Sequence, residues 1–212
     1  PAALATAITT ATARRPTVAF GYRRDGGQGS ATAARGVFAY TGEPTSPYDM
    51  TVWSPIRGGR YTTKVRTILV GGTAYVRGGG WHTVPATSRG RNTDATHTYA
   101  ALAAETRWCT SVQHVVALLL SSRAVRRSGL TYTGTASLAT LARDASIAPL
   151  YAQFTRAPRG TQITFAVKVD RNLLPVGLQV KVTPRKGSTV RPQTFLVTYA
   201  GWGRKTSIAP PG

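Results

Sequence analysis

"VRTILVGGTAYVRGGGWHTVP", residues 65–85, alternates apolar and polar side chains on both sides of a glycine pair at residues 71–72. Two glycines between alternating segments predict a β-hairpin with a two-residue turn, because such turns need positive φ angles that glycine adopts without strain. The turn length also predicts the register of the hairpin, in which Val70 faces Thr73.

The same register places Ile68 opposite Tyr75, and Arg66 opposite Arg77 at the open end of the hairpin. Two like charges directly opposite each other destabilise a strand pair. Two arrangements would relieve the repulsion: the guanidinium groups splay into water, or they hold an anion between them. The hairpin is therefore expected to present either a solvated pair of cations or an anion site.

Alternation with a period of two continues on both sides of the hairpin. Residues 18–22 and 48–52 show it before the hairpin, and residues 163–169, 176–182 and 195–199 show it in the last third of the chain. Each of these segments has one apolar and one polar face, as half-buried strands do. We expect about nine to eleven antiparallel strands. Because no change of composition marks a linker, residues 1–212 are expected to form a single domain.

Helical periodicity is expected in a few places. Residues 2–15 carry an apolar stripe at helical spacing, and a second helix is predicted to begin at residues 110–111 and to end at Gly129. Single helical turns or short helices are expected at residues 98–105 and 137–145. Cations favour the carboxyl end of a helix dipole, and the second helix would carry three arginines there: Arg123, Arg126 and Arg127.

Strands with one apolar face must close into a barrel, pack on a second sheet or be covered by helices. Here the helices fall at the start and in the middle of the chain, between two blocks of strands. We therefore predict an α+β fold in which a strongly curved antiparallel half-barrel sheet clasps two or three helices. So few helices can leave the concave side incompletely filled, which would form an apolar ligand cavity; the alternative is a core packed solid with the protein's own side chains.

The charge of the chain is strongly unbalanced, with 27 lysines and arginines against 7 aspartates and glutamates and a net charge of +20. Arginines outnumber lysines, and arginine binds phosphate and carboxylate through a bidentate fork. The excess indicates a polyanionic partner, such as an anionic membrane surface or a cell-wall polymer, or else it reflects GC-rich coding. The cations predicted to dock an anion are Arg60, Lys64, Arg66, Arg77, Arg123, Arg126 and Arg127.

Few residues are suited to catalysis or to metal binding. The seven carboxylates fall mostly in expected turns and loops, and the three histidines do not share a helix or strand face. Cys109 and His114 are five residues apart, a poor spacing for a nucleophile and its base on one helix, and a solitary cysteine is usually a small buried hydrophobe. We predict no enzyme activity, no metal and no cofactor. Nucleic acid is not an expected partner either, because no recognised binding motif is present.

Four segments carry a family resemblance when they are taken in order. They are the hairpin quoted above, "VVALLLSSRAVRRSGLTYTGTASLATLA" (115–142), "FAVKVDRNLLPVGLQVKV" (165–182) and "VTYAGWGRKTSIAPPG" (197–212). Together they resemble the actinobacterial lipoproteins of the LppX/LprG type, whose fold is that of the bacterial lipoprotein carrier LolA. The resemblance implies a half-open antiparallel barrel over helices, an apolar cavity for acyl chains, and export, often with tethering by a lipidated cysteine upstream of the domain.

The strand and helix patterns taken with this resemblance predict an exported, extracellular or envelope-located carrier that holds the acyl or isoprenoid chain of a lipid or lipoglycan. Its basic surface would dock on an anionic membrane or envelope polymer. The alternative is a polyanion-binding module, for a cell-wall polymer or nucleic acid, with a filled core. The residues predicted to line the apolar cavity are Phe38, Tyr40, Val52, Ile68, Val70, Tyr75, Val116, Leu119, Phe165, Val167 and Leu178.

Overall fold

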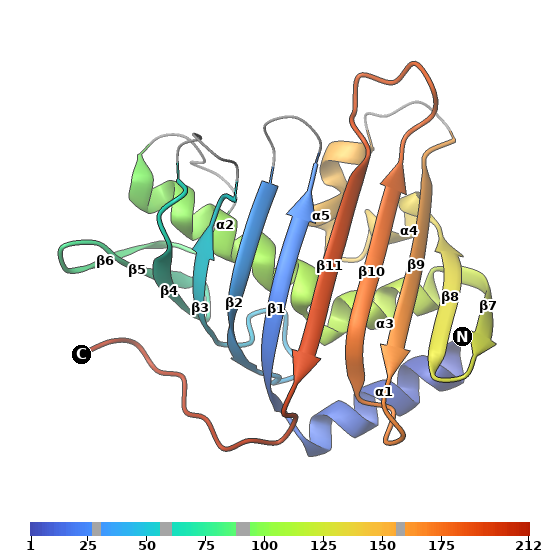
Figure 1. Cartoon of the computed structure of the whole chain (residues 1–212), viewed down its shortest axis with the longest axis horizontal. Helices are drawn as coiled ribbons and strands as arrows, with labels where there is room; N and C mark the ends of the chain where they lie inside the picture. The colour runs from blue at the N-terminus through green and yellow to red at the C-terminus, as the bar shows by residue number, and fades with distance from the viewer. Residues whose placement is uncertain (27–30, 56–60, 88–93, 156–159) are drawn as a thin grey trace.

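The computed structural model describes residues 1–26, 31–55, 61–87, 94–155 and 160–212, apart from the side chain of Gln153 (Figure 1). The helices are α1 (Ala2–Arg14), α2 (Ala95–Thr110), α3 (Val112–Leu120), α4 (Leu138–Leu141), α5 (Ala148–Tyr151) and the 3-10 helix η1 (Ala152–Phe154). The strands are β1 (Thr17–Asp25), β2 (Ala31–Ala39), β3 (Tyr48–Trp53), β4 (Val65–Val70), β5 (Thr73–Arg77), β6 (Trp81–Pro85), β7 (Ser122–Ser128), β8 (Thr131–Ala136), β9 (Gln162–Val169), β10 (Pro175–Thr183) and β11 (Gln193–Ala200).

These strands form one open antiparallel sheet of 11 strands in the order β6-β5-β4-β3-β2-β1-β11-β10-β9-β8-β7. Neighbours in the sheet are neighbours along the chain except at the centre, where the first strand pairs with the last. There Tyr22 of β1 faces Val197 of β11 on one side and Ala34 of β2 on the other. The pairing of β1 with β11 thus joins two meanders into a single sheet.

One face of the sheet is apolar and is covered by helices. Along β9, the buried residues Ile163, Phe165 and Val167 alternate with Thr164 and Lys168, which are exposed. Helix α2 contacts β3 to β6, α3 contacts β7 and β8, and α1 packs on α3. In Figure 1, α2 and α3 pass behind the sheet. The predicted α+β fold, with a curved antiparallel sheet clasping helices, is confirmed.

The hairpin of β4 and β5 has the predicted register. Val70 faces Thr73, and Ile68 faces Tyr75. Gly71 has a φ angle of +57°, in the region that glycine enters without strain. A two-residue glycine turn was therefore sufficient to align these two strands.

The prediction of a helix that ends at Gly129 is wrong for the second half of that segment. Helix α3 ends at Leu120, and Ser122–Ser128 is the edge strand β7. Gly129, with a φ angle of +58°, belongs to the tight turn from which β7 returns as β8. The segment of β7 has no apolar stripe that a helix could bury, whereas pairing with β8 satisfies its backbone groups. The three arginines assigned to a helix end therefore lie on a strand.

Helix α2 is longer than the single turn predicted within it. It begins after Asp94, whose side chain accepts a hydrogen bond from the backbone N–H of His97. Nearly every residue from Thr98 to Thr110 is buried, so this helix lacks the exposed polar face that produces a recognisable amphipathic pattern. No helix within the described ranges combines the length and the apolar character needed to span a membrane.

We expect Gly36→Ala to lower the free energy of unfolding by about 1–3 kcal/mol, the usual cost of overpacking. A Cβ atom at Gly36 would overlap the carbonyl oxygen of Asp49 and lie 2.6 Å from the Cα atom of Met50. Both contacts are backbone atoms of β3, which no side-chain rotation can move away. Urea denaturation measures the effect.

The matched control is Gly79→Ala, because a Cβ atom there would meet no atom within 4 Å. That variant should change the free energy of unfolding by less than about 0.5 kcal/mol. Equal stabilities of the two variants would contradict the close approach of β2 and β3.

Candidate functional site

The residues predicted to line a cavity fall into three groups. The core between the sheet and the helices contains Phe38, Val52, Leu119, Phe165, Val167 and Leu178. Two others, Tyr40 and Val116, are partly buried and pack against this core. The last group, Ile68, Val70 and Tyr75, lies on the opposite face of the sheet, because the core residues of β4 and β5 are Leu69, Ala74 and Val76. A shift of one residue along a strand accounts for this difference.

Aromatic side chains from β1, β2 and β3 pack against one another in the core. The ring of Phe38 stacks on that of Tyr48 with centroids 4.8 Å apart, and Phe20 meets Tyr48 edge-on at 5.6 Å. Trp202, two residues after β11, lies edge-on to Phe38 with ring centroids 6.1 Å apart. Its indole N–H donates a 2.7 Å hydrogen bond to the carbonyl oxygen of Pro175. At this point the interior is packed with the protein's own side chains.

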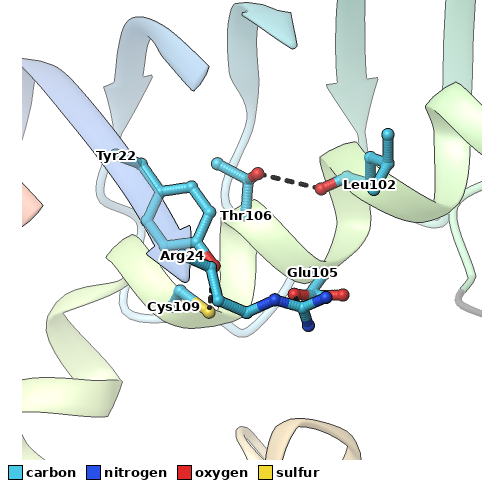
Figure 2. A network of polar contacts seen from close by, with 6 residues as sticks. All are labelled: Tyr22, Arg24, Leu102, Glu105, Thr106 and Cys109. Carbon is cyan, nitrogen blue, oxygen red and sulfur yellow. Dashed lines mark hydrogen bonds and ion pairs between the residues drawn. The ribbon is translucent and has the colours of Figure 1, made fainter. Parts of the chain in front are cut away.

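A buried polar network joins β1 to α2 (Figure 2). Arg24 forms an ion pair with Glu105, and the hydroxyl of Tyr22 donates a 3.1 Å hydrogen bond to the thiol sulfur of Cys109. Tyr22 and Arg24 are two residues apart and therefore share one face of β1, whereas Glu105 and Cys109 are four residues apart and share one face of α2, so the two pairs can meet. Burial raises the pKa of both Tyr22 and Cys109, so both groups remain protonated at neutral pH. The network ties the sheet to the helix and supplies no thiolate.

His114 does not act as a base toward Cys109. Its Nδ1 lies 2.9 Å from the carbonyl oxygen of Cys109 and its Nε2 lies 2.7 Å from the hydroxyl of Tyr151. A carbonyl only accepts, so Nδ1 carries the proton and Nε2 accepts from Tyr151. Burial lowers the pKa of His114 to about 4, and the ring is neutral at pH 7. Within the described ranges, no group of three or more His, Cys, Asp or Glu side chains is placed to hold a metal ion.

The opposite face of the sheet carries many cations. Its side chains occupy the strand positions that alternate with the buried core residues, and the face is turned toward the viewer in Figure 1. The carboxylates at these positions on the described strands are Asp25 and Asp49. We call the following cations the basic sheet face: Arg23, Arg35, Arg66, Arg77, Arg126, Lys168 and Lys181.

At the β4–β6 end of the basic sheet face, two arginines share one tryptophan. The guanidinium carbons of Arg66 and Arg77 lie 5.7 Å and 5.3 Å from the centroid of the Trp81 ring. Arg66 also donates two hydrogen bonds, of 3.0 Å and 2.7 Å, to the carboxylate of Asp49. An aromatic face and a carboxylate of the chain itself therefore offset the repulsion between these two arginines.

The other cations predicted to dock an anion are dispersed. Lys64 lies over the ring of Trp53 at 5.3 Å. Arg127 lies 5.7 Å from the ring centroid of Tyr132, whose side chain packs against the core and not on the basic sheet face. Arg60 is outside the described residues. The remaining two, Arg123 and Arg126, come together at the other end of the sheet.

An open groove of about 750 Å³ lies over β7 to β10, and we call it the β7–β10 groove. Its charged lining consists of Arg123, Arg126 and Lys181, and its lining includes no carboxylate. Hydroxyl and amide groups lie between these cations, on Thr133, Thr135, Thr164 and Gln179. The volume is in the range of ligand pockets, roughly 300–1,000 Å³. This arrangement is suited to binding an anion and offers no acid-base pair for catalysis.

Sequence reasoning identified two cations of the groove but missed Lys181, as it missed Arg35 and Lys168 elsewhere on the basic sheet face. The signal was present in the alternation. Each of these residues occupies a polar position within a period-two segment, between neighbours that are apolar or small. A cation at such a position belongs on the solvent face of a half-buried strand.

Comparison with known proteins places the fold. Lipoprotein LppX of Mycobacterium tuberculosis aligns with a TM-score of 0.52 at 12% sequence identity, over 98% of this chain and 97% of LppX. LprF of Mycobacterium bovis aligns with a TM-score of 0.52 at 13% identity, over 99% of this chain and 95% of LprF. No protein-family model and no curated protein sequence matches the chain. The fold resemblance drawn from the four sequence segments is thereby confirmed.

We expect Glu105→Gln to lower the free energy of unfolding by about 3–5 kcal/mol, because it leaves the buried guanidinium of Arg24 without the carboxylate that neutralises it. Asp49→Asn is the matched control. It removes an ion pair in which the Arg66 side chain is 55% exposed, and should cost less than about 1 kcal/mol. Urea denaturation at pH 7 compares the two. Similar losses would show that the buried pair does not anchor α2.

The low pKa of His114 predicts that stability falls as the pH drops below about 6.5. Between this value, the pKa of histidine in the unfolded chain, and about 4, the unfolded protein binds a proton that the native protein does not. From pH 7 to pH 5 the loss from this group should be on the order of 2 kcal/mol.

Urea denaturation at both pH values tests this, with His114→Gln expected to remove that part of the pH dependence. His82→Gln, at an exposed position, is expected to retain it. A pH dependence that persists unchanged in His114→Gln would disprove the assignment.

Proposed function

We propose that this chain is an exported, non-enzymatic carrier of the cell envelope that binds a lipid or lipoglycan and docks through the basic sheet face on an anionic membrane or envelope polymer. The observation that carries the proposal is the composition of that face. On the described strands, this face carries two carboxylates, Asp25 and Asp49, against seven cations: Arg23, Arg35, Arg66, Arg77, Arg126, Lys168 and Lys181.

The geometry of a sheet favours surface docking. Adjacent strands are about 4.8 Å apart, so Arg23 and Arg35 on β1 and β2, and Arg66 and Arg77 on β4 and β5, lie within about one Debye length, about 8–10 Å, of each other at physiological ionic strength. The fields of each such pair therefore add. Each lysine or arginine near an anionic membrane contributes about 1 kcal/mol of attraction. A few such cations in one plane are sufficient for salt-sensitive binding.

Two observations support the lipid-carrier part of the proposal. The fold is shared with LppX, which is described as a lipoprotein, and with LprF. The sheet also presents a predominantly apolar face to the helices, and an acyl or isoprenoid chain would bind against that face. Tethering by a lipidated cysteine upstream of the domain would hold the basic sheet face near a membrane.

A second candidate function is a polyanion-binding module without a lipid ligand. The packed aromatic cluster of Phe38, Tyr48 and Trp202 favours it, because side chains occupy the space that an acyl chain would need there. Both candidates use the same basic sheet face. They differ in whether the purified protein contains or takes up a lipid.

Vesicle binding tests the docking function. Phosphatidylcholine vesicles containing phosphatidylglycerol should bind the protein, with an affinity that falls steeply with added salt, whereas pure phosphatidylcholine vesicles should not bind it. The double variant Arg35→Gln/Lys168→Gln should lose about tenfold or more in vesicle affinity.

The matched control, Arg14→Gln/Arg143→Gln, removes two exposed cations from the helical side of the molecule, at the end of α1 and just after α4. It should bind nearly as well as the parent chain. Equal losses in the two double variants would show that net charge, and not the basic sheet face, causes the binding.

Lipid carriage has its own measurement. Organic extraction of the purified protein followed by mass spectrometry should release a lipid, or the protein should take up a fluorescent acyl probe at a stoichiometry near one. Vesicle binding without a released lipid or probe uptake would contradict carriage and support the polyanion-binding module.

A further inference from the structure

We propose that the β7–β10 groove is a binding site for a phosphate group carried on a hydroxyl-rich body, such as a phosphorylated polyol or sugar. The inference rests on the docking function proposed above and names the headgroup chemistry that this face would select. Arg123 and Arg126 bind the phosphate at one end of the groove, and the threonine hydroxyls beyond them bind the hydroxyls of the ligand.

Strand register arranges the groove in two parallel rows on the outward face. In one row Arg126 faces Thr133, which faces Ala166 and then Gln179. In the other row Thr135 faces Thr164, which faces Lys181. At about 4.8 Å per strand, the cations on β7 and β10 are separated by about 14 Å at the backbone. An extended ligand, with its anionic end at the arginines, fits that span.

The cations of the groove are available to a ligand. In the described part of the chain, Arg123, Arg126 and Lys181 form no ion pair, and the groove lining includes no carboxylate. This distinguishes the groove from the β4–β6 end of the same face, where Asp49 already binds Arg66. Concave surfaces lined by charges of one sign concentrate the field and attract counter-ions. The groove is therefore the place on the basic sheet face where an anion gains most.

The polar groups between the cations distinguish a phosphorylated polyol from a bare anion. Threonine hydroxyls both donate and accept hydrogen bonds, and so does the amide of Gln179, which suits ligand hydroxyls that do the same. Ala166 is small, and its outward position between Thr133 and Gln179 keeps the middle of the groove hollow.

Protection of an exposed sheet edge is the simpler explanation for the arginines. Charged side chains on an edge strand prevent pairing with other chains, and β7 is an edge strand. That role does not require Lys181, which lies on the interior strand β10, or the threonines on β8 and β9 that line the same groove. The combination of residues from four strands therefore points to a ligand.

Titration of the full chain with glucose 6-phosphate tests the proposal, with glucose and inorganic phosphate as separate probes. Isothermal calorimetry or chemical-shift changes should show glucose 6-phosphate binding about tenfold more tightly than either, because it engages both the arginines and the hydroxyls. The double variant Arg126→Gln/Lys181→Gln should lose about tenfold in affinity. Arg35→Gln/Lys168→Gln removes the same charge from outside the groove and should lose much less.

Ala166→Phe provides a variant that keeps every charge. Aromatic residues suit strands, and the new ring would occupy the middle of the groove. Thermal denaturation confirms that the variant folds. Loss of glucose 6-phosphate binding in a folded Ala166→Phe variant supports the groove as the site. Retention of full affinity in both Ala166→Phe and Arg126→Gln/Lys181→Gln, or no binding of the parent chain at millimolar glucose 6-phosphate, overturns the proposal.

Vesicles distinguish the source of the phosphate. Phosphatidylglycerol and phosphatidylserine vesicles carry equal charge, but only the former present a phosphate on a glycerol headgroup. A preference for phosphatidylglycerol that Ala166→Phe abolishes assigns the groove to lipid headgroups, and equal binding to both, with glucose 6-phosphate binding intact, assigns it to soluble phosphate esters. If vesicle binding persists while all groove tests fail, the docking function stands without the groove. If the groove binds glucose 6-phosphate while no vesicle binds, only the docking function fails.

Discussion

The alternation of side chains along one continuous antiparallel sheet is the constraint on which the rest of this structure depends. Each strand residue points either toward the helices or toward solvent, and the pairing of β1 with β11 makes that division common to both halves of the chain. The apolar core and the basic sheet face are two results of the same alternation. A one-residue change of register in β10, for example, would move Lys181 into the core and Val180 and Val182 into water.

The inward face is not wholly apolar. Arg24 of β1 is buried in an ion pair with Glu105 of α2, beside the hydrogen-bonded pair of Tyr22 and Cys109. Such groups gain little net stability over well-packed hydrophobic residues, but they tolerate few alternative placements. The network therefore makes α2 specific for one position under the sheet, whereas apolar contacts alone would allow the helix to slide.

The strands and the hairpin register were predictable from the sequence because period-two alternation and a Gly-Gly turn are local signals. The predictions that were wrong concerned elements whose structure depends on tertiary contacts. The arginine segment of β7 looks helical until β8 is available to pair with it, and α2 shows no amphipathic period because it is buried on nearly all sides. Assigning Ile68 and Tyr75 to the cavity side required knowing which face of β4 and β5 meets the helices. The groove was not predictable, because its cations come from strands far apart in the chain.

The single cysteine has a practical consequence. Cys109 is 0% exposed and its sulfur accepts a hydrogen bond from Tyr22, so an oxidant or alkylating reagent in solution reaches it only when α2 separates from the sheet. In an oxidising compartment the folded chain is thereby protected from mixed disulfides and covalent dimers, although it has no disulfide of its own. The same thiol is a built-in reporter, since its labelling rate measures how often the two layers come apart.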